Sequence, residues 1–204
     1  SWEDVQVQPL CSRQALAWAL YDWGNSAFAT TVMAGFFPLF FRQYWSAGAE
    51  VTETTLRLGI ANSFASLLIV ILAPLLGAVA DQMGARKRFL LFFAFLGIVM
   101  TALLPLAGSG QWGWAMLFYI VAAVGFSGSI TFYDSLLLFV AGRGEWDRIS
   151  ALGYALGYLG GGLLFALNVW MTLSPATFGL ASAAEAVRWS FLSVALWWAL
   201  FTLP

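Results

Sequence analysis

The chain has little charge, no histidine and almost no cysteine. Only 9% of its 204 residues are charged, whereas 61% are hydrophobic. A soluble protein covers its surface with charged residues at roughly a quarter of its positions, so this composition excludes a water-soluble enzyme. Without histidine, and with Cys11 as the single cysteine, the chain offers no imidazole or multi-thiolate metal site, no Cys/His catalysis and no intrachain disulfide. We therefore expect a bilayer protein that is not an enzyme and that holds no cofactor.

The charge balance also limits the partners. The formal net charge is -1 at pH 7, and the few basic residues form no stripe that could neutralise phosphates, so nucleic acid is not an expected partner. The expected partners are the lipid bilayer and a small-molecule substrate, together with protons.

Long apolar runs, interrupted by charged or turn-forming residues, occur six times. A membrane-spanning helix needs about 20 mostly apolar residues. The runs predict spanning helices at roughly 14–41, 56–80, 88–107, 112–141, 149–172 and 187–204. None of them has the alternating pattern of a barrel strand. The sequence therefore predicts an all-α, polytopic membrane protein with a single domain over residues 1–204 and no soluble catalytic part.

The basic residues of alternate loops predict the orientation, because Lys and Arg are retained on the cytoplasmic side of a membrane. One side receives six of them, namely Arg13, Arg86, Lys87, Arg88, Arg143 and Arg148. The other side receives Arg42, Arg57 and Arg188. This distribution predicts a multi-pass protein of the cell membrane with both termini in the cytoplasm.

Two ionisable side chains fall inside predicted spans. Asp22 lies nine residues after Arg13 in the first span, and Asp134 lies nine residues before Arg143 in the fourth. Nine helical residues rise about 14 Å, so both carboxylates are expected near the middle of a hydrocarbon core about 30 Å thick. An ionisable group there costs about 2.5 to 3.5 kcal/mol on insertion scales. A functional or cavity-facing role is favoured for both, and structural pairing is the alternative.

The two aspartates also stand in a repeated context. Each follows a tyrosine, as Tyr21-Asp22 and Tyr133-Asp134, in antiparallel helices three spans apart. Inverted three-helix repeats are how many transporters build a site at the bilayer midplane. We therefore predict that the six helices form two inverted three-helix repeats.

Further polar residues lie on the first, second, fourth and fifth spans. The residues expected to line a substrate and proton site with the two aspartates are Tyr21, Asn25, Asn62, Tyr133, Tyr154 and Tyr158. Intramembrane amides often only bond neighbouring helices, and this structural role is equally open for Asn25, Asn62 and Asn168. The third and sixth spans are almost wholly apolar and should face lipid. This distribution predicts a bundle with an aqueous cavity on one side.

The fifth span carries glycines four residues apart, at Gly153, Gly157 and Gly161. This spacing favours close helix packing, either within the bundle or against another subunit. It is not a dinucleotide-binding motif, because the glycines lie inside a span and follow no strand.

The turn between the second and third spans carries a known signature. The stretch from Gly77 to Arg88 resembles the cytoplasmic loop of the major facilitator superfamily, G-x-x-x-D-[RK]-x-G-[RK]-[RK]-[RK]. The matching residues are Gly77, Asp81, Gly84, Arg86, Lys87 and Arg88, whereas Gln82 and Ala85 replace basic residues. Three basic residues in a loop are otherwise an ordinary determinant of topology.

Two further stretches, 21–28 and 149–162, together with Tyr133-Asp134, are similar to a narrower branch. This branch is the unknown major facilitator group, related to the autophagy-related vacuolar amino-acid effluxers of fungi. The resemblance covers nearly the whole chain but only six of the twelve spans of such transporters. It implies that spans one and four line the substrate cavity and that spans two and five meet a second six-helix half.

In such transporters the loop aspartate, here Asp81, and the basic residues Arg86 to Arg88 would form a latch that holds the outward-facing state. The latch engages a helix of the second half, which this chain lacks. The chain could be a piece of a longer protein, a split subunit or a half that pairs with itself. The expected function is that of half of a secondary transporter moving an amino acid or another small metabolite by proton-coupled symport or antiport. The alternative is a membrane assembly subunit that kept the fold without transport.

Overall fold

The chain folds into long helices joined by short connections. The computed structural model describes residues 13–83, 85–140 and 142–202, and no strand occurs among them. The principal helices are α1 (Arg13–Ala27), α3 (Val51–Met83), α4 (Arg86–Leu103), α5 (Trp112–Val140), α6 (Trp146–Leu173) and α7 (Ala183–Thr202). Short segments extend or connect them, namely η3 (Leu104–Leu106), η4 (Arg143–Glu145) and η5 (Pro175–Phe178). The predicted all-α fold is confirmed.

The first helix changes its winding after one half of its length. From α1 the helical path continues through the π-helical η1 (Phe28–Phe36), α2 (Phe37–Phe40) and the π-helical η2 (Phe41–Trp45). The Thr30 hydroxyl donates a hydrogen bond to the Ser26 carbonyl at 3.0 Å, and Pro38 has no N–H to donate. Both features compete with regular α-helical bonding. Wide turns of this kind are rare and were not predicted from the sequence.

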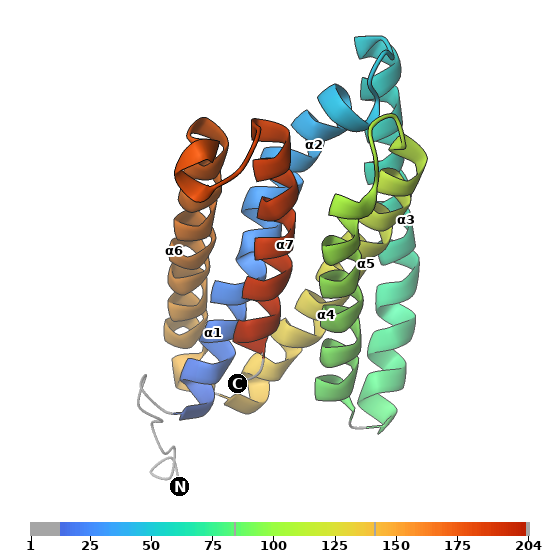
Figure 1. Ribbon diagram of the computed structural model, residues 1–204. Coiled ribbons are helices and arrows are strands. Elements are labelled where there is room, and N and C mark those ends of the chain that lie inside the picture. Colours follow the sequence, from blue (N-terminus) through green and yellow to red (C-terminus); the bar gives the residue numbers. More distant parts are fainter. Residues whose placement is uncertain (1–12, 84, 141, 203–204) are drawn as a thin grey trace, which may run out of the picture.

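Four of the described helices are long and apolar enough to cross a membrane, within α3, α4 with η3, α5 and α6. Helix α3 has 33 residues and a length of about 50 Å, so it extends beyond a hydrocarbon core of about 30 Å. The other two members of the bundle are α1, which has only 15 residues and contains Asp22 and Asn25, and α7, which contains Glu185 and Arg188. They run beside the four over the depth of the bundle (Figure 1).

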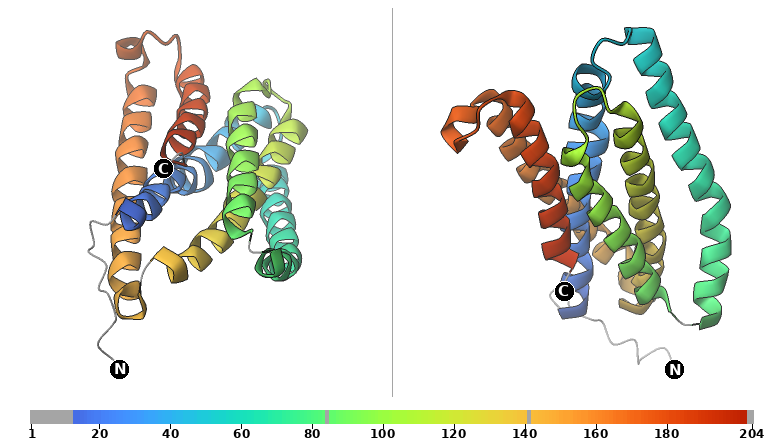
Figure 2. Two further views of the ribbon diagram at one scale, coloured as in Figure 1. Left: turned by 90° about the horizontal axis from the view of Figure 1, so that it is seen from below. Right: turned by 45° about the vertical axis from the view of Figure 1, so that its right-hand side comes forward.

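The bundle has α6 at one edge and α3 at the opposite edge, with the other helices between them (Figures 1 and 2). Helix α1 packs against α6 and α7, and α4 packs against α5 and α7. The start of α1, the end of α7 and the turn between α3 and α4 all lie at one end of the bundle (Figure 1). Helices α1 and α5 run in opposite directions. The start of α1 and the end of α5 therefore lie at the same end of the bundle, and residues equally far from these two helix ends lie at the same depth.

The glycines of α6 bring its backbone against α1. A Cβ atom at Gly153 would stand 2.7 Å from the Trp18 ring, and one at Gly161 would stand 3.0 Å from the Ser26 carbonyl. These glycines therefore allow close packing within the bundle, which is one of the two alternatives that the sequence predicts. A second close crossing joins α4 and α5, where a Cβ at Gly125 would lie 2.6 Å from the Gly97 amide nitrogen.

Candidate functional site

The Asp22 carboxylate lies in a niche between α1 and α6. Its side chain is half-buried and accepts a hydrogen bond from the Ser26 hydroxyl at 2.9 Å. The α6 backbone closes the niche, because a Cβ at Gly157 would stand 2.8 Å from the Asp22 Cγ atom. The niche therefore leaves room for a proton on Asp22 but not for a bulky substrate group between α1 and α6.

A stacked aromatic pair links α1 to α5 beside this niche. The Trp18 and Tyr133 rings stack at 4.2 Å between centroids with an interplanar angle of 7°. The Trp18 indole N–H also donates to the Tyr133 carbonyl at 3.0 Å. This contact fixes the register of the two antiparallel helices and brings Asp134 near enough to Asp22 for the two carboxylates to repel each other when both are charged.

Asp134 differs from Asp22 in its surroundings. Its side chain is exposed, and it makes no hydrogen bond or ion pair within the part of the chain that the structure describes. Thr131, about one turn away on α5, is exposed as well. On α6, Tyr154 is 61% exposed and lies within electrostatic reach of Tyr133, and Tyr158 is 79% exposed. Asp134 is therefore the carboxylate that a solute can reach.

The hydroxyls of the two site tyrosines have different surroundings. The Tyr21 hydroxyl donates to Ser129 Oγ of α5 at 2.7 Å and accepts from the Trp198 indole N–H of α7 at 3.4 Å. The Tyr133 hydroxyl is buried without a hydrogen-bond partner among the described residues, and so are both amide atoms of Asn25. Unpartnered buried polar groups are costly, so these atoms of Asn25 and Tyr133 lower the stability of this arrangement of the helices.

The remaining amides make hydrogen bonds between helices. Asn62 on α3 is exposed and accepts a hydrogen bond from the Tyr119 hydroxyl of α5 at 3.0 Å. Asn168 is fully buried, accepts from Thr31 at 3.1 Å and donates to Ser193 at 3.0 Å. It thereby joins α6 to η1 and α7, which is the structural role that the sequence left open.

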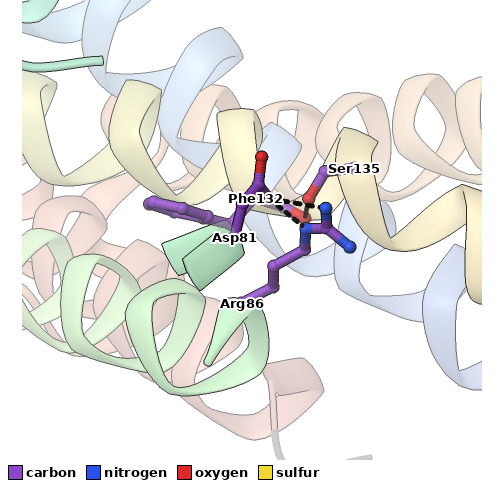
Figure 3. A network of polar contacts seen from close by, with 4 residues as sticks. All are labelled: Asp81, Arg86, Phe132 and Ser135. Carbon is purple, nitrogen blue, oxygen red and sulfur yellow. Dashed lines mark hydrogen bonds and ion pairs between the residues drawn. The ribbon is translucent and has the colours of Figure 1, made fainter. Parts of the chain in front are cut away.

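The residues of the predicted latch lie at the α3–α4 turn. The Arg86 guanidinium donates to the Asp81 carboxylate at 2.9 Å. Figure 3 shows this guanidinium directed both toward Asp81 and toward the Phe132–Ser135 stretch of α5. Gly77 lies in the last turns of α3, and Lys87 and Arg88 are exposed in the first turn of α4. Gly84 lies outside the described residues.

Two residues that bond the Tyr21 hydroxyl were not predicted from the sequence. They are Ser129 of α5 and Trp198 of α7. For Ser129 a signal existed, because Gly125 and Ser129 are small residues four positions apart on α5, the pattern of a close helix contact. Trp198 gave no such signal, since an apolar span with several tryptophans does not reveal which ring turns inward.

A bundle of long apolar helices with a carboxylate on α1, another on α5 and this loop between α3 and α4 is typical of a membrane protein of the major facilitator type. A family model described as "Vacuole effluxer Atg22 like" matches residues 46–143 and 142–204. The chain belongs to this family.

Two relatives give the same picture. The chain is 36% identical over 195 residues to the "Uncharacterized MFS-type transporter YxiO" of Bacillus subtilis (strain 168), a match covering 95% of this chain and 46% of that protein. It is 30% identical over 148 residues to an "Uncharacterized protein" of Aquifex aeolicus (strain VF5), covering 72% and 36%. This chain therefore aligns with less than half the length of each relative. No solved structure matches it significantly.

Proposed function

We propose that this chain is one half of a secondary active transporter that moves a small solute with a cationic group across the membrane by alternating access. The solute class that suits the site is an amino acid or a similar small metabolite, moved with protons in symport or antiport. The observation that carries the proposal is the pair of carboxylates, Asp22 and Asp134, on adjacent antiparallel helices at similar depth. None of the three ion pairs among the described residues includes either of them. Intramembrane carboxylates without a basic partner mark ion and substrate pathways.

The two carboxylates suit different tasks. Asp22 has a hydroxyl partner and a closed niche, so it can take up and release a proton without contacting the solute. Asp134 is exposed and unpartnered within the described residues, so it can act as counter-charge to an ammonium group. The repulsion between the two charges couples the tasks, because a cation at Asp134 lowers the cost of a negative charge on Asp22.

The outward faces of α3 and α6 support a second half as partner. Small or hydroxyl side chains recur on the exposed face of α3 at Thr52, Thr55, Gly59, Ser63 and Ser66. Exposed small residues recur on α6 at Ala151, Ala155, Gly162 and Ala166. Small residues let helix backbones approach closely and are typical of helix interfaces in membranes.

Exposed small residues distinguish these faces from those of α4 and α7. All four helices expose bulky apolar side chains, for example Phe64 on α3 and Leu163 on α6. Beyond the first turn of each helix, however, the exposed side chains of α4 and α7 are all bulky and apolar, namely Leu91, Phe92, Phe95, Trp189, Leu196 and Leu200. Their small residues, such as Gly97 and Ala195, are buried. The exposed small residues of α3 and α6 therefore favour these two helices as the contact with another protein surface. The second half would be a copy of this chain or a separate six-helix segment.

The first half of α3 presents an open face. It extends from Val51 to Leu67, and the residues that line it, Gly59 and Ser63 among them, all belong to α3. A helix of the second half could pack on this face. Asp81 lies near the other end of α3, and its partner Arg86 is the first residue of α4, so a helix packed along α3 could exchange contacts with both. We place this end of the bundle, with both termini, in the cytoplasm of the cell, in accord with its basic residues.

Uptake into liposomes tests the proposal. Protein reconstituted with an imposed pH gradient should accumulate one or more radiolabelled amino acids or related cationic metabolites, tested as a panel. The variant Asp22→Asn/Asp134→Asn should show background uptake and unchanged thermal stability. The same panel is tested with the second half present in the liposomes. If the unaltered protein then takes up none of the solutes, the role of an assembly subunit without transport is favoured instead.

A further inference from the structure

A cavity lies beside the proposed solute site and shares Tyr21 and Tyr133 with it, but neither Asp22 nor Asp134 lines it. Its volume is about 310 Å³, and it opens at the end of the bundle that carries the α3–α4 turn, among α1, α4, α5 and the last described residue of α7. Figure 2 (left) views the bundle from this end. All of its lining residues belong to these helices, so the cavity does not depend on the second half.

The lining changes character from the floor of this cavity to its mouth. The floor is aromatic and buried, with Trp18 and Tyr133, and the wall is aliphatic, with Leu90 and Leu136. The mouth is polar, with Gln14 and Lys87. An apolar interior behind a single cationic rim residue matches a molecule that has an apolar chain and one anionic end.

The charge at the mouth lacks an internal counterpart. Lys87 is exposed and makes no hydrogen bond or ion pair within the described residues, whereas Asp81 is already engaged by Arg86. None of the lining residues is acidic. The first turn of α4 holds Arg86, Lys87 and Arg88 with no acidic residue, and its N-cap, Ala85, provides no side-chain acceptor. A helix N-terminus already favours negative charge, so three cations there leave a strong attraction for an anion.

We propose that this cavity binds an anionic amphiphile. Its apolar chain would lie along Leu90 and Leu136, and its anionic head would contact Lys87 and the first-turn amides of α4. Two sources share this chemistry, namely an anionic phospholipid of the bilayer and a free fatty acid. Basic pockets between transmembrane helices near the cytoplasmic surface commonly bind anionic lipid heads.

The cavity lies against the contact between α1 and α5. The floor is one side of the Trp18–Tyr133 stack, which holds α1 and α5 in the register that brings Asp22 and Asp134 together. A bound amphiphile would therefore contact this stack directly. Binding itself does not require that the protein transports anything.

Native mass spectrometry of the purified full chain tests the site. The protein is titrated separately with dioleoylphosphatidylglycerol, dioleoylphosphatidylethanolamine and oleate. We expect one tight phosphatidylglycerol adduct and weaker phosphatidylethanolamine binding. Lys87→Gln should weaken the adduct about fivefold, since one basic residue near a lipid surface contributes about 1 kcal/mol. The control Arg88→Gln removes the same charge one residue away, outside the lining, and should weaken the adduct clearly less than Lys87→Gln does.

A steric variant separates the cavity from surface charge. Ala17 lines the cavity, so Ala17→Phe should abolish the tight adduct while Lys87→Arg retains it. Circular dichroism of each variant confirms that it is folded. Tight oleate binding with no phosphatidylglycerol preference would identify a fatty acid as the source. Equal weakening by Lys87→Gln and Arg88→Gln, or an adduct that survives Ala17→Phe, would overturn the proposal, whatever the outcome of transport assays.

Discussion

The backbone of α6 at Gly157 lies directly against the Asp22 carboxylate of α1. A Cβ atom there would stand 2.8 Å from Asp22 Cγ and 2.8 Å from Ser26 Oγ, so any larger residue must displace the carboxylate or separate the helices. We expect Gly157→Ala to reduce proton-coupled uptake as strongly as Asp22→Asn and to lower stability by about 1 to 3 kcal/mol, the usual range for overpacking.

The control is Gly113→Ala near the start of α5, where a Cβ meets nothing within 4 Å and which lies on neither face proposed to meet the second half. It should retain uptake and melting temperature, measured by thermal unfolding in detergent. If both alanine variants behaved alike, the closed niche around Asp22 would be wrong.

The crossing of α4 and α5 should be equally intolerant of side chains. Because a Cβ at Gly125 would lie 2.6 Å from the Gly97 nitrogen and 2.7 Å from the Phe93 carbonyl, backbone atoms rather than flexible side chains must move. We expect Gly125→Ala to cost about 1 to 3 kcal/mol in the free energy of unfolding. Gly113→Ala, in open space near the start of α5, should change it little. Unfolding titrated with sodium dodecyl sulfate measures both variants, and equal values would refute the close crossing.

Much of this architecture follows from the sequence, because the bilayer restricts what a chain can do. The helical class follows from the lengths of the apolar runs, and the spacing of the charges predicts that Asp22 and Asp134 lie at similar depth. The glycine spacing of α6 predicts close helix packing, either within the bundle or against another subunit. The contact of Gly157 with α1 is the first of these, and the spacing alone does not reveal which neighbour a helix packs against.

Other features could not be predicted, because they depend on which helices become neighbours. The π-helical winding after Ala27 combines a side-chain bond of Thr30 with packing of its neighbours, and no periodicity announces it. The bond between Tyr21 and Ser129 joins residues 108 positions apart, so only the tertiary arrangement reveals it.

Asn168 should act as a hydrogen-bonding link between helices. Asn168→Ala removes the hydrogen bonds that join this residue to Thr31 and Ser193. The hydroxyl of each of these two residues then has one hydrogen-bond partner fewer. Interhelical hydrogen bonds in membranes contribute about 0.6 kcal/mol on average, so we expect a loss of about 1 to 2 kcal/mol. Thr31→Val, which removes one of the two bonds, should lose roughly half as much. A stability unchanged by Asn168→Ala would show that this network does not join α6 to its neighbours.

The small-residue faces of α3 and α6 should determine association with a second half. Gly59→Trp and Ala155→Trp each place a large ring on one of these faces, and both should abolish assembly with the second half in a co-purification or crosslinking assay. Phe95→Trp places the same ring on the bulky outward face of α4 and should leave assembly intact. Association that tolerates Gly59→Trp and Ala155→Trp but fails in Phe95→Trp would assign the interface to α4 instead.

The most direct test of the central claim uses liposomes that contain the assembled transporter. A pH dye inside the liposomes records proton movement driven by the solute, and a second assay measures solute exchange without a gradient. We expect Asp22→Asn to abolish proton movement while exchange continues, because Asp22 carries the proton and Asp134 still receives the solute. Asp134→Asn should abolish both. Proton movement that persists unchanged in Asp22→Asn, or exchange that persists unchanged in Asp134→Asn, would contradict the assignment of these two carboxylates.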